Sequence, residues 1–229
     1  MLAIVDYGRG NLRSVQNGFG RIGVAAQVSG DPETIAKADG VVFPGVGAFR
    51  DCMENLAARG LDEALHQVIG DGKPVLAICV GMQALLSESE EFGTTPGLDI
   101  VAGRVRRFPQ PAPHSSPCDG TSQRQSARLE PTAPIAARQR LKVPHMGWNQ
   151  LHLHRPCPLL DGLPERVYTY FVHSYYAIPA EPAVVVASTD YGVEFASVLW
   201  RDNLYATQFH PEKSQKWGLR ILRNFAQLL

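Results

Sequence analysis

The sequence predicts an α/β protein with an open, mostly parallel or mixed sheet flanked by helices, of flavodoxin-like type, and a β-rich C-terminal half. Three observations support this fold class. Short apolar runs at 2–5, 40–43 and 75–78 each lead into a turn, which is typical of buried parallel strands. Apolar residues recur at helical spacing after the first and the third run. From Leu151 onward, short strand patterns separated by turn residues dominate.

Length and composition set the broad class. With 229 residues the chain can bury a sizeable core, and we expect a single domain over residues 1–229. The 22 basic and 22 acidic residues give a net charge of zero, which favours neither nucleic acid nor a membrane surface as partner. No apolar run is long enough for a membrane span, and the N-terminus lacks a signal-peptide pattern.

Cysteine usage points to a reducing compartment. The four cysteines have neither metal-ligand spacing nor a disulfide-rich pattern: Cys52, Cys79, Cys118 and Cys157. We therefore expect a cytoplasmic protein without a bound metal.

The first half of the chain alternates strand and helix patterns. After the strand at 2–5, the glycine-containing stretch 6–11 predicts a sharply turning loop, and residues 12–22 predict an amphipathic helix. A second strand is expected at 24–28. Asp31, followed by a proline, predicts the capped start of a short helix.

The third strand, 40–43, ends at Pro44–Gly47, where two glycines flank Val46. Such a backbone is free to direct its N–H groups, as an oxyanion-binding site requires. An ordinary strand-to-helix turn explains the same residues, and the segment alone leaves both interpretations open. An amphipathic helix over 61–69 then leads to the next strand.

Cys79 lies between the apolar run 75–78 and a helical pattern that starts at Val80 and includes Leu85 and Leu86. A reactive residue between a buried strand and a helix, with small neighbours, has the arrangement of a nucleophile elbow. The helix N-terminus would favour thiolate over thiol. An ordinary buried cysteine is the alternative, and this segment by itself does not exclude it.

Residues 204–214 supply the groups that a cysteine nucleophile needs. They read as a strand that runs into a loop with His210 and Glu212. A histidine can take and return the proton of the thiol, and a carboxylate can hold the imidazole ring and its tautomer. Together with Cys79, this pair predicts a catalytic triad.

Three further segments complete the pattern. Glu88, Glu90 and Glu91 form an acidic stretch that is either solvated or binds an ammonium group. Residues 109–140 are rich in proline and polar side chains and predict a disordered surface insertion. The C-terminal half has five strand candidates and then an amphipathic helix capped near Ser214. The strands are expected at 151–153, 168–172, 183–188, 194–200 and 204–209.

Six separated motifs, which together extend from the N-terminus to the C-terminal helix, resemble those of the triad-type (class I) glutamine amidotransferases. Within that family they are similar to the glutaminase subunits of imidazole glycerol phosphate synthase, an enzyme of histidine biosynthesis. The motifs are Asp6-Tyr-Gly-Arg-Gly-Asn11, Pro44-Gly-Val-Gly-Ala-Phe49, Ala77-Ile-Cys-Val-Gly-Met-Gln83, Pro144-His-Met-Gly-Trp-Asn149, Tyr170-Phe-Val-His-Ser-Tyr-Tyr176 and Gln208-Phe-His-Pro-Glu-Lys-Ser214.

The resemblance implies a role for each motif. Cys79, His210 and Glu212 would be the catalytic triad, with the backbone N–H groups of Val46 and Val80 as oxyanion donors. The residues expected to contact the substrate glutamine are Gly45, Gly47, Gln83, Glu91, Ser174 and Tyr175. The residues expected at a partner interface are Arg9, Asn11, Arg13, His145 and Trp148.

The resemblance also implies a partner. The chain would form a heterodimer with a separate (βα)8-barrel cyclase and pass ammonia to it. That cyclase would join the ammonia to a phosphoribulosyl formimino ribonucleotide, and the products would be imidazole glycerol phosphate and an aminoimidazole carboxamide ribotide. The two-subunit enzyme would have hydrolase and lyase activities without any cofactor. Glutaminase activity would stay low until the loaded partner binds.

Two departures from the family pattern and two alternatives stand beside this hypothesis. Ala77 replaces the usual glycine, which matters only if that residue needs a positive φ. The insertion at 109–140 replaces a short connection, with either no role or a role at the interface. The glutaminase subunit of pyridoxal phosphate synthase typically has Gly-Gly-Glu-Ser in place of Pro44–Gly47. A catalytically silent docking subunit would not need an intact triad.

Overall fold

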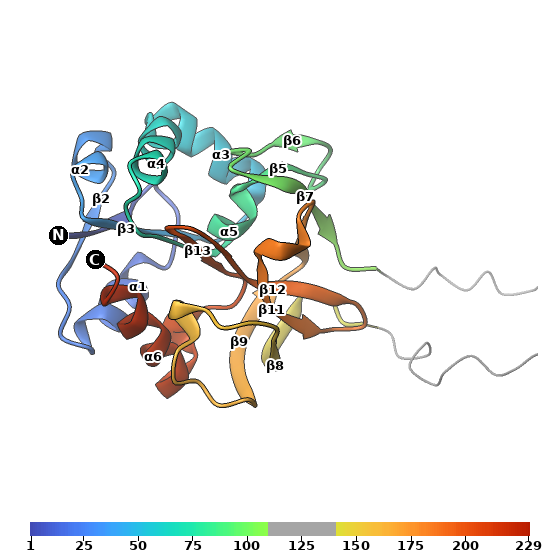
Figure 1. Cartoon of the computed structure of the whole chain (residues 1–229). Coiled ribbons are helices and arrows are strands. Elements are labelled where there is room, and N and C mark those ends of the chain that lie inside the picture. The colour runs from blue at the N-terminus through green and yellow to red at the C-terminus, as the bar shows by residue number, and fades with distance from the viewer. Residues whose placement is uncertain (110–140) are drawn as a thin grey trace, which may run out of the picture.

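The computed structural model describes residues 1–109 and 141–229, and in these residues a nine-stranded mixed sheet forms the centre of the fold (Figure 1). The strand order is β2-β1-β3-β4-β13-β12-β11-β8-β9. The first five strands are parallel to one another and the last four run antiparallel to their neighbours. The parallel strands are β1 (Leu2–Val5), β2 (Ala26–Ser29), β3 (Gly40–Gly45), β4 (Val75–Cys79) and β13 (Leu204–Thr207). The antiparallel strands are β8 (His145–Leu153), β9 (Val167–His173), β11 (Val185–Asp190) and β12 (Glu194–Arg201).

Helices cover both faces of the parallel part of this sheet. Helices α1 and α6 lie on one face, and α2, α3 and α4 lie on the other (Figure 1). The helices are α1 (Leu12–Gly20), α2 (Pro32–Ala36), α3 (Phe49–Ala58), α4 (Leu61–Gly70), α5 (Val80–Ala84) and α6 (Gln215–Ala226). Strands β1, β3, β4 and β13 are buried along their whole length, because helices exclude water from both of their faces.

A second, four-stranded sheet has the order β10-β7-β5-β6 and lies beside α3 and α5. It consists of β5 (Leu86–Ser89), β6 (Thr95–Pro96), β7 (Val101–Arg107) and β10 (Tyr175–Pro179). Short 3-10 turns at Pro158–Leu160, Pro182–Val184 and Pro211–Lys213 complete the description. The predicted fold class is confirmed: α/β, with a mixed sheet between helices and a β-rich C-terminal half.

Local sequence signals placed most elements well. The helix expected at 61–69 is α4, and the short helix after Asp31 is α2, where Asp31 accepts a hydrogen bond from the Thr34 N–H at 3.0 Å. Ser214 stands at the N-terminus of α6, as expected, yet its hydroxyl makes no capping bond. It bonds instead to the carbonyl of His210 at 2.7 Å, which leaves the helix end uncapped.

Other predictions were wrong or incomplete. The helix after Cys79 ends at Ala84, so Leu86 already belongs to strand β5. Helix α3 and the strands of the second sheet had not been predicted from the sequence. The expected strand at 151–153 begins at His145, because the Pro144–Asn149 motif is itself extended and pairs with β9.

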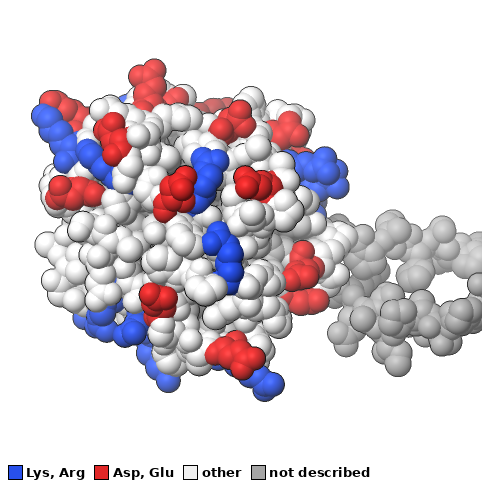
Figure 2. Space-filling view, viewed as in Figure 1, with Lys and Arg blue, Asp and Glu red and all other residues white. Residues whose placement is uncertain are grey.

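Surface properties agree with the balanced composition. On the face shown in Figure 2, basic and acidic side chains are interspersed and no large patch of one sign forms. Among the helices described, none is long and apolar enough to cross a membrane. The insertion predicted at 109–140 lies outside the described residues, apart from Pro109.

Candidate active site

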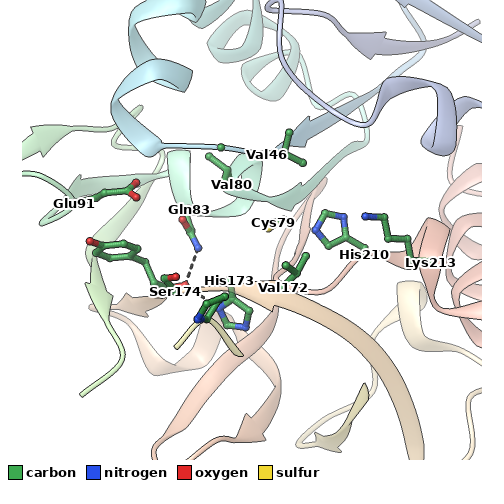
Figure 3. A pocket seen from close by; sticks show the side chains of 13 residues that line it. Val46, Cys79, Val80, Gln83, Glu91, Val172, His173, Ser174, His210 and Lys213 are labelled. Carbon is green, nitrogen blue, oxygen red and sulfur yellow. Dashed lines mark hydrogen bonds between the residues drawn. The ribbon is translucent and has the colours of Figure 1, made fainter. Parts of the chain in front are cut away.

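A cavity of about 310 Å³ opens beside Cys79, at the carboxyl ends of strands β3 and β4 (Figure 3). Ligands bind at this edge of an open parallel sheet because the loops that follow the strands converge there. The lining residues come from segments far apart in the sequence. They are Val46, Gly47, Cys79, Val80, Gln83, Glu91, Pro144, Val172, His173, Ser174, Tyr175, His210 and Lys213.

Cys79 has the backbone geometry of a nucleophile elbow. It ends β4, precedes the first residue of α5, and has φ 57° and ψ −110°. This left-handed region costs a residue with a Cβ about 1–3 kcal/mol, a strain that is typical of functional sites. The turn is tight: a Cβ on Gly81 would lie 2.1 Å from the Phe43 carbonyl oxygen, and one on Gly45 would lie 2.3 Å from the Gly81 nitrogen.

Two neighbours of the elbow, Ala77 and Gly45, were also the subject of predictions. Ala77 is a buried strand residue without a positive φ, so its methyl group packs in the core and the left-handed residue is Cys79 itself. Gly45 does not line the cavity. It lies under the elbow, where its missing side chain lets the backbone of Gly81 approach. Gly45 therefore has a structural role in this arrangement, and its contact with substrate stays a prediction.

His210 and Glu212 form a buried pair beside Cys79. Nδ1 of His210 and Oε1 of Glu212 lie 2.8 Å apart, and both side chains are almost completely excluded from solvent. Within the described part of the chain, Nε2 of His210 has no hydrogen-bond partner. Figure 3 shows the imidazole ring beside Cys79 at the cavity. Since Nδ1 faces Glu212, Nε2 is the nitrogen left to exchange a proton with the sulfur.

Electrostatics favours the charged form of His210. Burial alone lowers the pKa of His210, but interactions with the Cys79 sulfur and with Glu212 outweigh it and raise this pKa to about 10. The imidazole is therefore protonated at neutral pH when the sulfur is a thiolate. A thiolate–imidazolium pair of this kind is the reactive form of a cysteine nucleophile.

Backbone hydrogen bonds hold the loop that carries this pair against strand β9. The His210 N–H donates to the Tyr170 carbonyl at 3.0 Å, and the Tyr170 N–H donates to the Ser214 hydroxyl at 3.0 Å. The Ser214 hydroxyl in turn donates to the His210 carbonyl. The imidazole is thus positioned by the sheet rather than by a free loop.

Val46 is not arranged as an oxyanion donor in this structure. Its backbone N–H donates to the hydroxyl of Tyr7 at 3.3 Å. Tyr7 is completely buried, and burial together with the neighbouring Cys52 raises the pKa of its phenol. The phenol is therefore neutral and can accept this bond. Val80 is the first residue of α5, so the helix provides no acceptor for its N–H.

Of the six residues expected to contact substrate, five line the cavity. These five are Gly47, Gln83, Glu91, Ser174 and Tyr175. Figure 3 shows Gln83, Glu91 and Ser174 on the side of Cys79 that faces away from His210. Glu91 is already engaged, because its Oε2 accepts the Phe49 N–H at 2.6 Å, at the start of α3. Gln83 donates through Nε2 to the Tyr175 carbonyl at 2.8 Å.

His145, which the resemblance assigned to a partner interface, is buried in the chain by itself and offers almost no surface to a partner. Nδ1 of His145 lies 3.1 Å from Nε2 of His173, and Nδ1 of His173 lies 2.8 Å from the Tyr175 carbonyl. Burial lowers the pKa of His145 to about 4 and that of His173 to about 3. Both rings are therefore neutral at pH 7. The carbonyl fixes the tautomers, because only a protonated Nδ1 of His173 can donate to it.

The other residues expected at the interface have exposed or partly exposed side chains. Arg9 and Arg13 are exposed, Asn11 is partly exposed, and Arg9 lies 3.6 Å from the carboxylate of Asp51. Trp148 is 47% exposed on β8. Met146 and Tyr168 beside it are also exposed, so the β8–β9 ribbon presents an apolar surface.

The site contains residues that the sequence did not reveal as functional. Tyr7, His173 and Gln208 each lie in a recognised motif, yet they contact segments far apart in the chain, which contain Val46, His145 and Cys79 respectively. The only signal for them was the presence of a polar side chain within an otherwise buried motif.

Comparison with known proteins agrees with this geometry. The family model for class-I glutamine amidotransferases matches residues 3–228. An imidazole glycerol phosphate synthase subunit HisH from Syntrophotalea carbinolica is 50% identical over 228 residues, which cover 100% of both chains. A HisH subunit from Geobacter sulfurreducens is 47% identical over 227 residues, 99% of this chain and 98% of that one.

A solved structure shows that the fold is shared at low identity. A crystal structure of a glutamine amidotransferase superposes with a TM-score of 0.67 at 16% identity, and covers 99% of this chain and 97% of that chain. The family match extends across the elbow, the cavity and the His210–Glu212 loop. The chain therefore belongs to the class-I glutamine amidotransferase family and, within it, to the group that contains the HisH subunits of imidazole glycerol phosphate synthase.

Proposed function

We propose that this chain is the glutaminase subunit of an imidazole glycerol phosphate synthase. It hydrolyses glutamine to glutamate and ammonia and supplies the ammonia to a separate cyclase subunit in histidine biosynthesis. The observation that carries the proposal is the buried Cys79–His210–Glu212 constellation at a strained elbow beside a cavity. The high identity to HisH subunits supports the pathway. The lyase chemistry belongs to the partner subunit.

The reaction begins with attack of the Cys79 thiolate on the side-chain carboxamide carbon of glutamine. His210 carries the proton through Nε2 and gives it to the departing ammonia, which leaves a thioester. His210 then takes a proton from water, and the hydroxide attacks the thioester carbonyl. The carbon–sulfur bond breaks with its electron pair on sulfur, so glutamate and the thiolate are regenerated. Glu212 holds the imidazole ring and stabilises its charged form.

The cavity offers contacts for the two ends of the substrate. Oε1 of Glu91 is available for the α-ammonium group, while Oε2 accepts the hydrogen bond from the Phe49 N–H. Gln83 uses its amide nitrogen in bonds within the protein, so its carbonyl oxygen is the atom left for the substrate. Ser174 and Tyr175 line the same end of the cavity, where the α-carboxylate would lie.

The partner is a (βα)8-barrel cyclase in a one-to-one heterodimer. The exposed apolar surface of Met146, Trp148 and Tyr168 offers it a contact area, and Arg9 and Asn11 offer exposed or partly exposed polar groups. Tryptophan and tyrosine at the centre of a patch are typical anchors of protein interfaces.

Tyr7 gives a physical reason for low activity without the partner. While the Val46 N–H is bonded to the Tyr7 hydroxyl, it cannot stabilise the oxyanion of the tetrahedral intermediate. Tyr7→Phe removes this acceptor. A buried neutral hydrogen bond is worth about 1 kcal/mol, so we expect glutamate release by the subunit alone to rise about fivefold.

The matched control for that measurement is Tyr168→Phe, which removes a hydroxyl from an exposed tyrosine on β9. Its basal activity is expected to equal that of the wild type. A Tyr7→Phe protein that melts normally but releases glutamate no faster than the wild type would show that the hydroxyl does not restrain Val46.

Glutamate release from glutamine tests the proposed function. The chain is assayed alone, with a barrel cyclase, and with the cyclase plus its ribonucleotide substrate. We expect weak release alone and strong release with the loaded cyclase. Rapid release that does not change when the cyclase is added would support glutaminase activity but reject the proposed pathway. That result would be expected of a subunit of pyridoxal phosphate synthase. No release under any condition would favour a silent docking subunit.

A further inference from the structure

Gln208 is a completely buried polar residue that directly contacts the nucleophile. It follows strand β13, two residues before His210, and its backbone N–H donates to the Ser197 carbonyl at 2.9 Å. Its side-chain Nε2 lies 3.7 Å from Sγ of Cys79, within hydrogen-bonding distance for sulfur. Burying a polar amide costs free energy unless its groups are bonded, so this contact is part of how Gln208 is satisfied.

The orientation of the Gln208 amide follows from a backbone carbonyl. The carbonyl of Tyr175 can only accept, so the Gln83 atom 2.8 Å from it is the amide nitrogen (Figure 3). The other N–H of that nitrogen donates to Oε1 of Gln208 at 3.0 Å. Oε1 of Gln208 therefore faces Gln83, and the remaining end of the amide, Nε2, faces the sulfur.

The neutral pair of His145 and His173 helps to fix this orientation by holding the Tyr175 carbonyl. His173 donates through Nδ1 to the same Tyr175 carbonyl at 2.8 Å, and His145 bonds to His173 at 3.1 Å. The carbonyl thus receives two donors and is held in place. Because Gln83 and His173 are both nearly completely buried, water does not compete for these bonds.

We propose that Gln208 is the hydrogen-bond donor that stabilises the Cys79 thiolate, with its amide held in the donating orientation by Gln83. This role rests on the glutaminase function proposed above. A carboxamide N–H is a suitable donor here because the amide does not ionise, so it keeps its proton and its position throughout the cycle. His210, in contrast, has to give its proton to ammonia and later act as a base toward water. During thioester breakdown Gln208 therefore still stabilises the sulfur as it takes up the electron pair.

The pH dependence of Cys79 alkylation tests this role directly. Iodoacetamide, a small neutral carboxamide, reacts with the thiolate and not with the thiol. The rate at Cys79 is followed by mass spectrometry of its peptide between pH 5 and pH 10. Gln208→Met has a similar length but no donor, and Gln208→Glu has a similar shape but only acceptors when it is ionised.

We expect the half-maximal pH of alkylation to rise by about one unit in Gln208→Met and further in Gln208→Glu. Alkylation at pH values below the midpoint then slows about tenfold, while the plateau rate at high pH is kept. Gln83→Met removes the bond that orients Gln208, so a smaller rise of the midpoint is expected. Gln67→Glu, an exposed change on α4, is the control with an unchanged profile.

The outcomes separate this role from a structural one. A folded Gln208→Met protein with the wild-type midpoint overturns the proposal, as does a lower plateau without any shift, which indicates altered access. If Gln208→Met does not fold, Gln208→Glu and Gln83→Met decide by the same criterion. Wild-type glutamate release, with Cys79→Ala as blank, is measured on the same preparations. The absence of release even with the loaded cyclase would reject the glutaminase function whatever the midpoints are.

Discussion

Replacing Cys79 with alanine is expected to reduce glutamate release by at least four powers of ten, even with the loaded cyclase present. In the proposed mechanism the sulfur forms the covalent bond to the substrate. Among the described residues that line the cavity, Cys79 is the only cysteine, and it alone occupies the elbow. Members of a triad act as a unit, so the remaining His210 and Glu212 contribute little once the nucleophile is gone. Glutamate release under single-turnover and steady-state conditions measures the loss.

Substitutions of Cys79 should affect stability in a different way from activity. Cys79 has φ 57°, a conformation that glycine adopts without strain. We expect Cys79→Gly to be as inactive as Cys79→Ala but to be more stable by about 1 kcal/mol, because alanine keeps the strain that glycine relieves. Thermal melting of the two variants measures this difference.

Cys157→Ala is the matched control for both measurements. Cys157 is also buried, precedes a 3-10 turn, and does not line the cavity. Its variant should keep wild-type activity. Glutamate release by Cys79→Ala within tenfold of the wild type would rule out Cys79 as the nucleophile. Equal melting temperatures for Cys79→Gly and Cys79→Ala would show that the elbow is not strained.

Replacing Glu212 with glutamine is expected to lower kcat about a thousandfold with little change in KM. The amide keeps the size of the carboxylate but loses the negative charge that faces Nδ1 of His210 at 2.8 Å. The imidazolium is then stabilised less, and the ring is no longer held in one tautomer. Glu212 does not line the cavity, so substrate binding should be nearly unaffected.

The direction in which the pH profile of Glu212→Gln should shift follows from the pKa of His210. Glu212 is one of the groups that raise the pKa of His210 to about 10, so its neutralisation lowers that pKa. Activity requires the protonated imidazole as the acid for ammonia. The alkaline limb of the kcat profile should therefore move to lower pH in Glu212→Gln, by about one unit or more.

Glu194→Gln provides a matched control, because Glu194 lies 3.8 Å from Nε2 of His154 in an exposed histidine–glutamate pair. An exposed pair of this kind contributes little, so this variant should have the wild-type profile. An unshifted alkaline limb in Glu212→Gln would mean that the carboxylate does not set the charge of His210.

The three residues of the proposed triad could be located in the sequence because each lies in a locally recognisable segment. An apolar strand followed by a helical pattern placed Cys79 at an elbow, and a strand followed by a histidine and a glutamate placed His210 and Glu212 in one loop. The parallel strands β3, β4 and β13 then bring their carboxyl ends to the same edge, as their buried apolar runs predict. Local periodicity reports backbone conformation and burial, which is sufficient for these positions.

Contacts between distant segments were decided only by the tertiary structure. The bond from Val46 to Tyr7 spans 39 positions, and the contact of Gln208 with Cys79 spans 129. The sequence marked Val46 as an oxyanion donor and His145 as an interface residue, yet packing turns the first toward Tyr7 and buries the second. The pattern of a strand predicts which side chains point to each face of the sheet. It does not predict which group a buried polar side chain will bond to. By itself the sequence determined the fold class and the family and located the three residues of the predicted triad; only packing decided how the amides, rings and hydroxyls around the sulfur are oriented.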